Sequence, residues 1–326
     1  MRNKISIIIV NWNTKDDTRR CIESIYRNCT LKFEIIVIDN NSQDNSYAHL
    51  KERFPKIRLV QNKKNLGYAK ANNLGFKLAK YDFVIVLNPD TQIQKGTFES
   101  LVKFYKNNPH VGAVVPKLLN PNGSTQYYYH RKLPTLKYQI ASLIYNYTPF
   151  KKFRWSQEFF LLDQKFESDT LIEQAAGVCI LTTKSVLKKI GGLFDPKLPI
   201  FLNDVDFSFR IKKHGFSIFL AADSKLIHYR SSSTSKLDPY TLRQEVILSI
   251  LHYLKKNSGF LSYATAKGFI LILLAIVFVL NLTGLSKNYL MVRITNRRES
   301  FAKQWKNLTA TITERRNHPG LRVYGS

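Results

Sequence analysis

The sequence predicts an α/β fold in which a mostly parallel β-sheet is covered by helices on both faces. Short apolar runs rich in β-branched residues, typical of buried central strands, alternate with segments whose apolar residues follow a helical period. Two of these runs stop at an aspartate, Asp39 and Asp90. Open α/β sheets bind ligands at the carboxyl ends of their strands, so both aspartates are candidate site residues at one edge of the sheet.

The alternation is clearest in the N-terminal part of the chain. The expected strands are residues 5–10, 33–38, 57–60 and 84–87, and the expected helices between them are residues 16–28, 46–54 and 67–80. Strands that alternate with helices in this way form parallel sheets. Pro89 cannot donate a hydrogen bond to a strand ladder, so the run 84–87 ends there and leaves Asp90 beyond it. A plain turn at Asn88-Pro89-Asp90 is the alternative interpretation.

The pattern continues with shorter elements. The expected elements are helix 98–107, strand 111–115, helix 185–190, a helix from Asp204 to about His214, and strands 216–221 and 225–229. Acidic residues are favoured in a first helical turn, which gives Asp204 and Asp206 a structural alternative to a functional role. Asp204 lies at the cap, however, where a side chain can face a cleft. The polar residues 231–235 indicate a boundary.

Residues 127–160 differ from the rest, because tyrosine, phenylalanine and tryptophan are interleaved there with lysine and arginine. The segment reads as an insertion with exposed aromatic side chains. It forms either a small satellite core or a surface that binds a large or apolar acceptor.

The chain of 326 residues carries a formal net charge of +27, which indicates a polyanionic or anionic neighbour. Nucleic acid, acidic lipid and phosphorylated substrates all fit this charge. Three cysteines, Cys21, Cys29 and Cys179, have no metal-ligand spacing and are expected to be free thiols in a reducing compartment.

Residues 268–285 contain no charged side chain and would span about 27 Å as a helix, close to the thickness of a bilayer core. Lysine and arginine flank the segment on both sides. The expected division is therefore a catalytic domain over 1–235 and a helical, membrane-associated region over 236–326. A buried core helix is the alternative for 268–285.

Several motifs together resemble family 2 glycosyltransferases, and in particular their rhamnosyltransferase-like branch. The motifs are Asp39-Asn40-Asn41-Ser42, Asn65 to Asn72, Leu87-Asn88-Pro89-Asp90, Gly191-Gly192-Leu193-Phe194-Asp195, Asn203-Asp204-Val205-Asp206 and His228. The match covers about residues 4–235. It implies a GT-A fold, a nucleotide-sugar donor, a divalent metal (Mg²⁺ or Mn²⁺) and inversion at the anomeric carbon.

The resemblance also implies roles for individual residues. Asp39 matches the acid that accepts from the imide of a uracil or thymine base, and Asp204 matches the catalytic base. Asp90 and His228 match the metal ligands, whereas Asn88 stands where the family's metal motif has an aspartate and so removes one negative charge. The implied donor site consists of Asn11, Asn13, Asp39, Asn41, Gly67, Asn72, Asn88 and Asp90.

The implied chemistry accounts for these residue types. A divalent cation on oxygen ligands neutralises the charge that builds on a departing nucleoside diphosphate. Inversion by direct displacement needs one base that takes the proton of the acceptor hydroxyl, and Asp204 suits this role. A retaining mechanism with a covalent intermediate is not excluded by spacing. The implied acceptor is a glycan or a polyprenyl-linked sugar in cell-surface polysaccharide synthesis.

Other functions fit less well. The basic residues are spread over the whole chain, and carboxylates at strand ends repel phosphate, so we expect no nucleic-acid partner. The turn after the first strand, Asn11-Trp12-Asn13-Thr14, lacks the glycine pattern of a dinucleotide-binding dehydrogenase. A nucleotidyltransferase acting on sugar phosphates remains the nearest alternative, although it would not need a membrane segment.

Nucleotide sugars are cytosolic, so the catalytic domain is expected on the cytoplasmic side of the cell membrane. A single span at 268–285 would export the tail 287–326, which is rich in lysine and arginine. Because basic segments tend to stay in the cytoplasm, we expect the segment to enter the cytoplasmic leaflet and return, with full spanning as the second choice.

Overall fold

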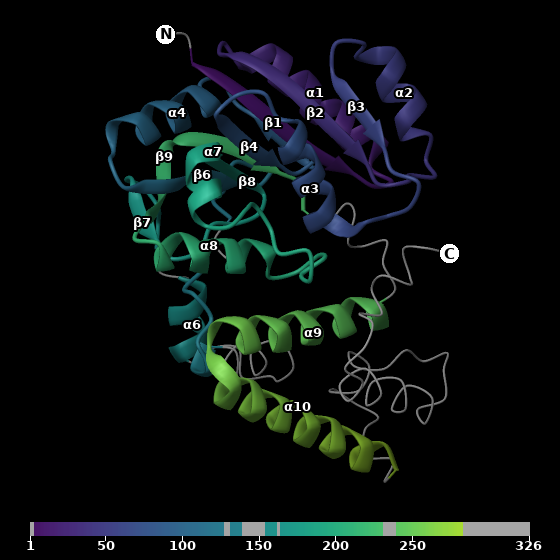
Figure 1. Ribbon diagram of the computed structural model, residues 1–326, viewed down its shortest axis with the longest axis vertical. Helices are drawn as coiled ribbons and strands as arrows, with labels where there is room; N and C mark the ends of the chain where they lie inside the picture. Colours follow the sequence, from purple (N-terminus) through teal and green to yellow (C-terminus); the bar gives the residue numbers. More distant parts are fainter. Residues whose placement is uncertain (1–2, 127–130, 139–153, 162–163, 231–238, 283–326) are drawn as a thin grey trace. The chain divides into compact units, whose positions relative to one another are not determined.

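The structure, a computed structural model, describes residues 3–126, 131–138, 154–161, 164–230 and 239–282 (Figure 1). The predicted tyrosine-rich start of the insertion at 127–129, the boundary at 231–235 and the basic tail 287–326 therefore lie outside the described residues. The chain divides into two compact units. The first consists of residues 1–133 and 160–236, and the second of residues 134–159 and 237–326.

A mixed, mainly parallel sheet organises the first unit. Its strands are β1 (Lys4–Asn11), β2 (Lys32–Asp39), β3 (Arg58–Gln61), β4 (Phe83–Leu87), β5 (Thr91–Ile93), β6 (Val111–Leu119), β7 (Thr170–Ile172), β8 (Cys179–Thr183) and β9 (Ser217–His228). Their order is β3-β2-β1-β4-β8-β6-β9-β5, with β7 paired to β9. The four N-terminal strands are mutually parallel, as predicted, and β6 is parallel to β9.

The antiparallel strands were not predicted. β8 runs antiparallel between β4 and β6, and the short strands β5 and β7 pair antiparallel with β9. The expectation of two strands at 216–221 and 225–229 was wrong, because β9 is continuous. Its register against β6 shifts between Ala221 and Lys225, so the gap between the two expected strands is an irregularity within one strand.

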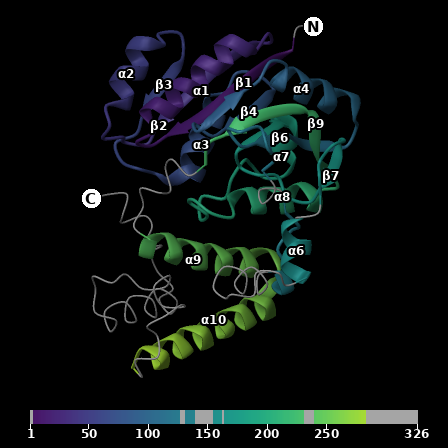
Figure 2. The same ribbon diagram turned by 180° about the vertical axis from the view of Figure 1, so that it is seen from behind.

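Helices cover both faces of the sheet (Figure 1). The helices α1 (Lys15–Asn28), α2 (Ser46–Arg53) and α4 (Thr97–Asn107) share a core with Ile5, Ile7 and Ile9 of β1. On the other face, α3 (Gly67–Leu78) packs against Ile8 and Val10, while α7 (Lys184–Lys189) and α8 (Asn203–Lys213) pack farther along the sheet. The alternation along β1 follows the two-residue period of a strand. Figure 2 shows the same two layers from behind.

The packing of α3 against β1 depends on a glycine. A Cβ atom at Gly75 would lie 2.4 Å from Ile8 Cγ2, so no larger residue fits without a shift of the helix. The start of α3 is held next to the end of β2 by a separate contact, in which Asn40 Nδ2 donates to Gly67 O over 3.3 Å.

Helices α9 (Pro239–Asn257) and α10 (Gly259–Leu282) belong to the second unit and pack against each other. The short helix α6 (Arg154–Phe160) also belongs to the second unit, except for its last residue. Helix α9 ends where Ser258 N donates to Leu254 O over 2.9 Å, and Gly259 adopts a left-handed φ of +85°. Helix α10 includes residues 268–282 of the predicted apolar segment, and residues 283–285 lie outside the described residues. Among the residues that the structure describes, no helix has both the length and the apolar character required to cross a membrane.

Candidate active site

The carboxyl ends of β1, β2 and β4 lie side by side, because β1 pairs in parallel with both neighbours. Asn11 and Asp39 are register partners at this edge, and Asn11 Nδ2 donates to Asp39 Oδ1 over 2.7 Å. Asn11 Oδ1 accepts from the hydroxyls of Thr14 and Thr18 at 2.8 and 2.7 Å. With both ends of its carboxamide engaged, Asn11 has a fixed orientation and holds the Asp39 carboxylate in place.

The loops after β1 and β2 are tied together by short polar contacts. Ser42 N donates to Asp39 Oδ2 at 3.1 Å, and Ser42 Oγ accepts from Asn13 N at 2.9 Å. Asn13 and Asn41 adopt left-handed φ angles of +53° and +63°, which asparagine tolerates better than most residues. The predicted residues Asn11, Asn13, Asp39 and Asn41 are therefore brought together. The Asp39 side chain is fully buried within this group.

Two other predicted donor-site residues lie in α3 and have structural contacts of their own. Gly67 begins the helix with a φ of +77°, and a Cβ there would lie 3.0 Å from both Cβ and the carbonyl oxygen of Pro199. Asn72 is almost completely buried, with Nδ2 donating to Tyr68 O at 3.0 Å. Its buried Oδ1 makes no hydrogen bond to any residue that the structure describes.

A chain of hydrogen bonds links the end of β4 to the start of α8. The Tyr68 hydroxyl oxygen lies 3.0 Å from the side-chain oxygen of Asn88 and 2.7 Å from Gly177 O. Gly177 N in turn donates to Asp204 Oδ2 over 3.0 Å. The predicted donor-side residue Asn88 and the predicted base Asp204 thus share one network, connected through two residues far apart in the sequence.

Asp204 lies in the first turn of α8 and is partly exposed. Besides the bond from Gly177, its Oδ1 accepts from Val205 N at 2.9 Å. Burial raises the pKa of Asp204 above its usual range, although the Gly177 N–H and the positive charge of Arg131 act in the opposite direction. A carboxylate with a raised pKa is a stronger base once ionised, which is the property that proton abstraction requires.

Asp206, two residues further on, has a structural role. Its side chain is fully buried and forms an ion pair with Arg210 at 2.9 Å. The Arg210 guanidinium also donates to the carbonyl oxygens of Ile190, Gly192 and Leu193 at 2.7–3.0 Å. The pair therefore fastens α8 to the loop that contains Gly191-Gly192.

Asp90 and His228 meet across the β5–β9 pair, with His228 Nε2 3.5 Å from Asp90 Oδ1. Both side chains are nearly buried. On the other side of the ring, His228 Nδ1 lies 3.0 Å from Gln126 Oε1. Gln126 Nε2 donates to the carbonyl oxygens of His228 and Leu119 at 2.7 and 3.2 Å, which fixes the orientation of its amide.

This arrangement fits a divalent cation whose remaining ligands come from the substrate. Since Gln126 presents an oxygen to Nδ1, the proton of a neutral His228 ring resides on Nδ1, and the Nε2 lone pair faces Asp90. One carboxylate and one imidazole are suitable ligands, and the oxygens of a diphosphate would supply others. Within the described residues, no group of three or more histidine, cysteine, aspartate or glutamate side chains is arranged to hold a metal ion by itself.

Sequence reasoning missed four residues that build this site: Tyr68, Gln126, Gly177 and Arg131. Tyr68 and Gly177 lie within segments that were recognised for other reasons, and their link spans over a hundred positions of sequence. Gln126 directly precedes the aromatic insertion, and no signal in the sequence pairs it with His228. Arg131 belongs to the basic residues of the insertion. Their number suggested a binding surface, but no pattern linked Arg131 to Asp204.

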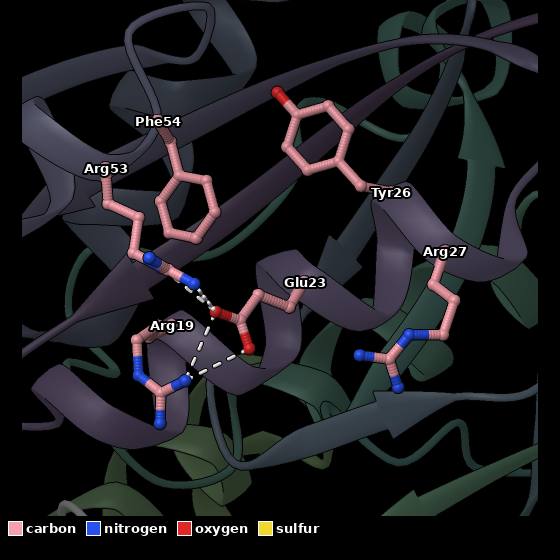
Figure 3. A pocket seen from close by; sticks show the side chains of 6 residues that line it. All are labelled: Arg19, Glu23, Tyr26, Arg27, Arg53 and Phe54. Atoms are coloured by element: carbon pink, nitrogen blue, oxygen red, sulfur yellow. Dashed lines mark hydrogen bonds and ion pairs between the residues drawn. The ribbon is translucent and has the colours of Figure 1, made fainter.

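An open hollow of about 490 Å³ lies elsewhere, between α1 and the end of α2. Figure 3 shows Glu23 there between Arg19 and Arg53, with Tyr26, Arg27 and Phe54 around it. Glu23 accepts hydrogen bonds from Arg53 at 2.9 and 3.0 Å and from Arg19 at 3.0 and 3.2 Å. Because both oxygens of Glu23 are engaged, this cluster joins α2 to α1. None of the predicted site residues lines it.

The family is decided by a comparison of the sequence with known protein families. A model described as glycosyl transferase family 2 matches residues 6–191, more than half of the chain. The chain belongs to this family. It is a glycosyltransferase, and the predicted resemblance is confirmed.

One similar protein is the N-acetylglucosaminyl-diphospho-decaprenol L-rhamnosyltransferase of Mycobacterium tuberculosis. It is 25% identical over 252 residues, which cover 73% of this family 2 chain and 80% of the relative. The family 2 chain is thus rhamnosyltransferase-like over most of its length.

Solved structures confirm the GT-A-like fold. The structure of GalNAc-T7 with UDP, GalNAc and Mn²⁺ superposes with a TM-score of 0.56 at 19% identity, covering 76% of this chain and 48% of that one. Residues 1–349 of Staphylococcus aureus TarS give a TM-score of 0.52 at 18% identity, covering 95% of this chain and 80% of that one. At these identities the likeness concerns the fold alone.

Proposed function

We propose that this family 2 enzyme transfers a sugar from a UDP- or dTDP-sugar to a glycan or lipid-linked acceptor, with inversion at the anomeric carbon. The observation that carries the proposal is the hydrogen-bonded chain from Asn88 through Tyr68 and Gly177 to Asp204. It joins a donor-side residue to a carboxylate with a raised pKa.

Asp204 acts as the general base. Gly177 N–H and Val205 N–H orient its carboxylate, and each oxygen keeps a lone pair that can take the proton of an acceptor hydroxyl. The deprotonated hydroxyl oxygen then attacks the anomeric carbon from the side opposite the departing nucleoside diphosphate. A single displacement of this kind inverts the configuration.

The donor binds along the carboxyl edge of β1, β2 and β4. Asp39 accepts the imide N–H of a uracil or thymine base. One of its oxygens accepts from Asn11 Nδ2 and the other from Ser42 N, and a carboxylate oxygen can accept a second hydrogen bond. The loops that hold Asn13 and Asn41 flank this position. Asn88 and Asp90 lie toward the diphosphate.

Asp90 and His228 would hold a divalent metal, Mg²⁺ or Mn²⁺. When bound, the metal would neutralise the negative charge that develops on the leaving diphosphate. Gln126 keeps the His228 ring in the orientation and tautomer that direct Nε2 toward Asp90.

A donor panel tests the proposal. The purified protein is titrated by calorimetry with UDP-, dTDP- and GDP-sugars, each with Mn²⁺, with Mg²⁺ and with EDTA. We expect binding of a uracil- or thymine-containing donor in the presence of metal, and NMR of the product should show inverted anomeric configuration. Binding of GDP-sugars alone, or a retained configuration, would contradict the proposal.

The acceptor side involves the membrane. The relative from M. tuberculosis is named for a diphospho-decaprenol substrate, and the net charge of +27 here suits an anionic surface, at about 1 kcal/mol for each basic residue near the membrane. We place the enzyme at the cytoplasmic face of the cell membrane, where the C-terminal region and the aromatic insertion 127–160 contact a polyprenyl-linked acceptor.

Cell fractionation tests the location. The protein should sediment with membranes and require detergent for release, and a C-terminal tag should be protected from external protease in intact cells. Release by high salt alone would reduce the attachment to electrostatics. A protein that is soluble without detergent would refute membrane attachment and leave the transfer reaction untouched.

A further inference from the structure

The hydroxyl of Tyr68 has only one proton to donate. A hydrogen bond from the Asn72 side chain, which lowers the pKa of Tyr68, leaves that proton to be shared between two other polar neighbours. Its oxygen lies 2.7 Å from Gly177 O and 3.0 Å from the side chain of Asn88. A backbone carbonyl oxygen can only accept, so the hydroxyl proton belongs to the bond with Gly177. Burial, together with the charges of Asp204 and Asp90, raises the pKa of Tyr68 well above its usual range, so this proton stays on the hydroxyl.

The Asn88 side chain must therefore act as the donor in the other contact. The oxygen and nitrogen of a carboxamide are indistinguishable by shape, and their assignment follows from the hydrogen bonds that they make. Turned so that Nδ2 faces Tyr68, Asn88 satisfies the second contact as well. The two distances agree, because 2.7 Å is typical of an O–H···O bond and 3.0 Å of an N–H···O bond.

The backbone polar atoms of Asn88 already have hydrogen-bond partners within the protein. Its backbone N–H donates to Val178 O at 2.8 Å, and its backbone oxygen accepts from the Thr91 hydroxyl at 2.7 Å. The side chain is partly exposed, and its second polar atom makes no hydrogen bond to a residue that the structure describes. That atom is the part of Asn88 left for a ligand.

We propose that Tyr68 is a positioning residue that turns the Asn88 carboxamide so that its carbonyl oxygen, and not its NH₂ group, faces the nucleotide. The inference rests on the proposed function. Asn88 then offers an electron pair to a hydroxyl hydrogen of the ribose or to the divalent cation. It presents an oxygen where the family motif has a carboxylate, without the negative charge.

A rescue experiment tests this orientation. Tyr68→Phe removes the acceptor that holds Nδ2 and lets the carboxamide rotate, so the affinity for UDP or dTDP with Mn²⁺ should fall about fivefold. Adding Asn88→Asp to Tyr68→Phe should restore the affinity, because a carboxylate presents an oxygen in either orientation. If NH₂ faces the nucleotide, the double variant binds more weakly than Tyr68→Phe, and the proposal is wrong.

Tyr105→Phe is the matched control. It also removes a tyrosine hydroxyl that is hydrogen-bonded to another residue, at 3.0 Å from Thr183 Oγ1 and away from the predicted site. It should leave the nucleotide affinity unchanged. Thermal unfolding of each variant shows whether a loss of affinity reflects a loss of folding instead.

Two comparisons identify what Asn88 binds. If the cation is its partner, the effects of Tyr68→Phe and Asn88→Asp disappear in EDTA. If a ribose hydroxyl is its partner, the effects persist in EDTA, and a difference between UDP and dTDP indicates the 2′-hydroxyl. Both results agree with an outward-facing oxygen.

A measurement without ligand separates this inference from the proposed function. In ¹⁵N-labelled protein, the Asn88 NH₂ group should exchange slowly with solvent, since it is bonded to a buried hydroxyl, and Tyr68→Phe should remove that protection. Fast exchange in the parent would refute the orientation even if the nucleotide binds. Failure of the parent to bind UDP or dTDP, with slow exchange intact, would refute the proposed function alone.

Discussion

Gln126 Oε1 lies 3.0 Å from His228 Nδ1, and this contact determines which nitrogen of the ring faces Asp90. The Gln126 amide cannot turn around, because its Nε2 donates to the carbonyl oxygens of His228 and Leu119. If Asp90 and His228 hold a metal as proposed, its affinity should therefore depend on Gln126, a residue that would not itself touch the metal.

We predict that Gln126→Leu weakens Mn²⁺ binding by at least about tenfold, because the His228 ring loses the partner that orients it. Removal of such a partner typically lowers metal affinity by about 10–100-fold. Asp90→Ala should weaken metal-dependent nucleotide binding, and His228→Ala should show a smaller effect of the same kind. Calorimetry with UDP and Mn²⁺ measures all three. Gln92→Leu is the control, since Gln92 contacts the exposed Tyr229 instead. Equal rates of sugar transfer by the parent with and without EDTA would show that the reaction needs no metal.

The second prediction concerns the base. Asp204→Asn should lower the transfer rate by about 10²–10⁴-fold, as expected when a general base is lost. The affinity for the nucleotide should stay nearly unchanged, because the substitution keeps the shape of the side chain and Asp204 is not among the residues proposed to bind the nucleotide. Single-turnover kinetics and calorimetry measure the two effects separately. Turnover close to that of the parent would refute the assignment.

The third prediction concerns pH. Because burial raises the pKa of Asp204, the base is protonated over a wider acidic range, and kcat/KM for the acceptor should fall as the pH drops through that raised value. Arg131 lowers this pKa, so Arg131→Gln should move the acidic limb of the profile to higher pH. Lys132→Gln, which removes the neighbouring positive charge, should not move it. An unchanged profile in Arg131→Gln would show that another group controls the acidic limb.

The strand ends were predictable from the sequence because parallel strands leave local signals. The apolar run that stops at Asp39 is β2, the run 84–87 that precedes Asp90 is β4, and the helix expected from Asp204 is α8. The family and the fold followed from these motifs. The strand β8, Cys179–Thr183, is also a buried run of apolar and β-branched residues, but such a run does not show whether a strand pairs parallel or antiparallel with its neighbours.

The contacts that orient the site residues were not predictable in the same way. Gln126 and His228 are 102 positions apart, and Tyr68 and Gly177 are 109 apart, so no local period connects them. Each pair meets only because strands and helices from distant parts of the chain converge at one sheet edge. Gly67 and Asn72 belong to the motif, yet Gly67 packs against Pro199 and Asn72 donates to Tyr68 O, contacts that serve the structure of α3 and its neighbours.

The fourth prediction concerns the α1–α2 cluster in Figure 3. Burial acts against ionisation of Glu23, but the hydrogen bonds from Arg53 and Arg19 outweigh it and lower the pKa of Glu23. When the pKa of a carboxyl group is lower in the folded state, its ionised form stabilises the protein at pH values above its pKa in the unfolded state, about 4.3. This stabilisation is lost as the pH falls through the pKa of the folded state. Glu23→Gln should therefore destabilise the protein at pH 7 by less than about 1 kcal/mol.

Urea unfolding of the parent and Glu23→Gln, repeated from pH 7 to acidic pH, measures this difference. The two curves should converge at low pH. Glu52→Gln is the control, because Glu52 is an exposed acid on α2 outside the hollow. A difference that persists at acidic pH would show that the ion pairs are not its source.

The fifth prediction separates Asp206 from Asp204. Asp206 is fully buried and forms an ion pair with Arg210, so Arg210→Met would remove the positive charge that faces this buried carboxylate in the parent. We expect a loss of about 3–5 kcal/mol in the free energy of unfolding. The double variant Asp206→Leu with Arg210→Met should lose less, because no charge remains buried, although the bonds to the carbonyls of Ile190, Gly192 and Leu193 are still missing. Chemical denaturation of both variants tests this. If the double variant is no more stable than Arg210→Met, the anchoring of the glycine loop, and not the buried charge, dominates the effect.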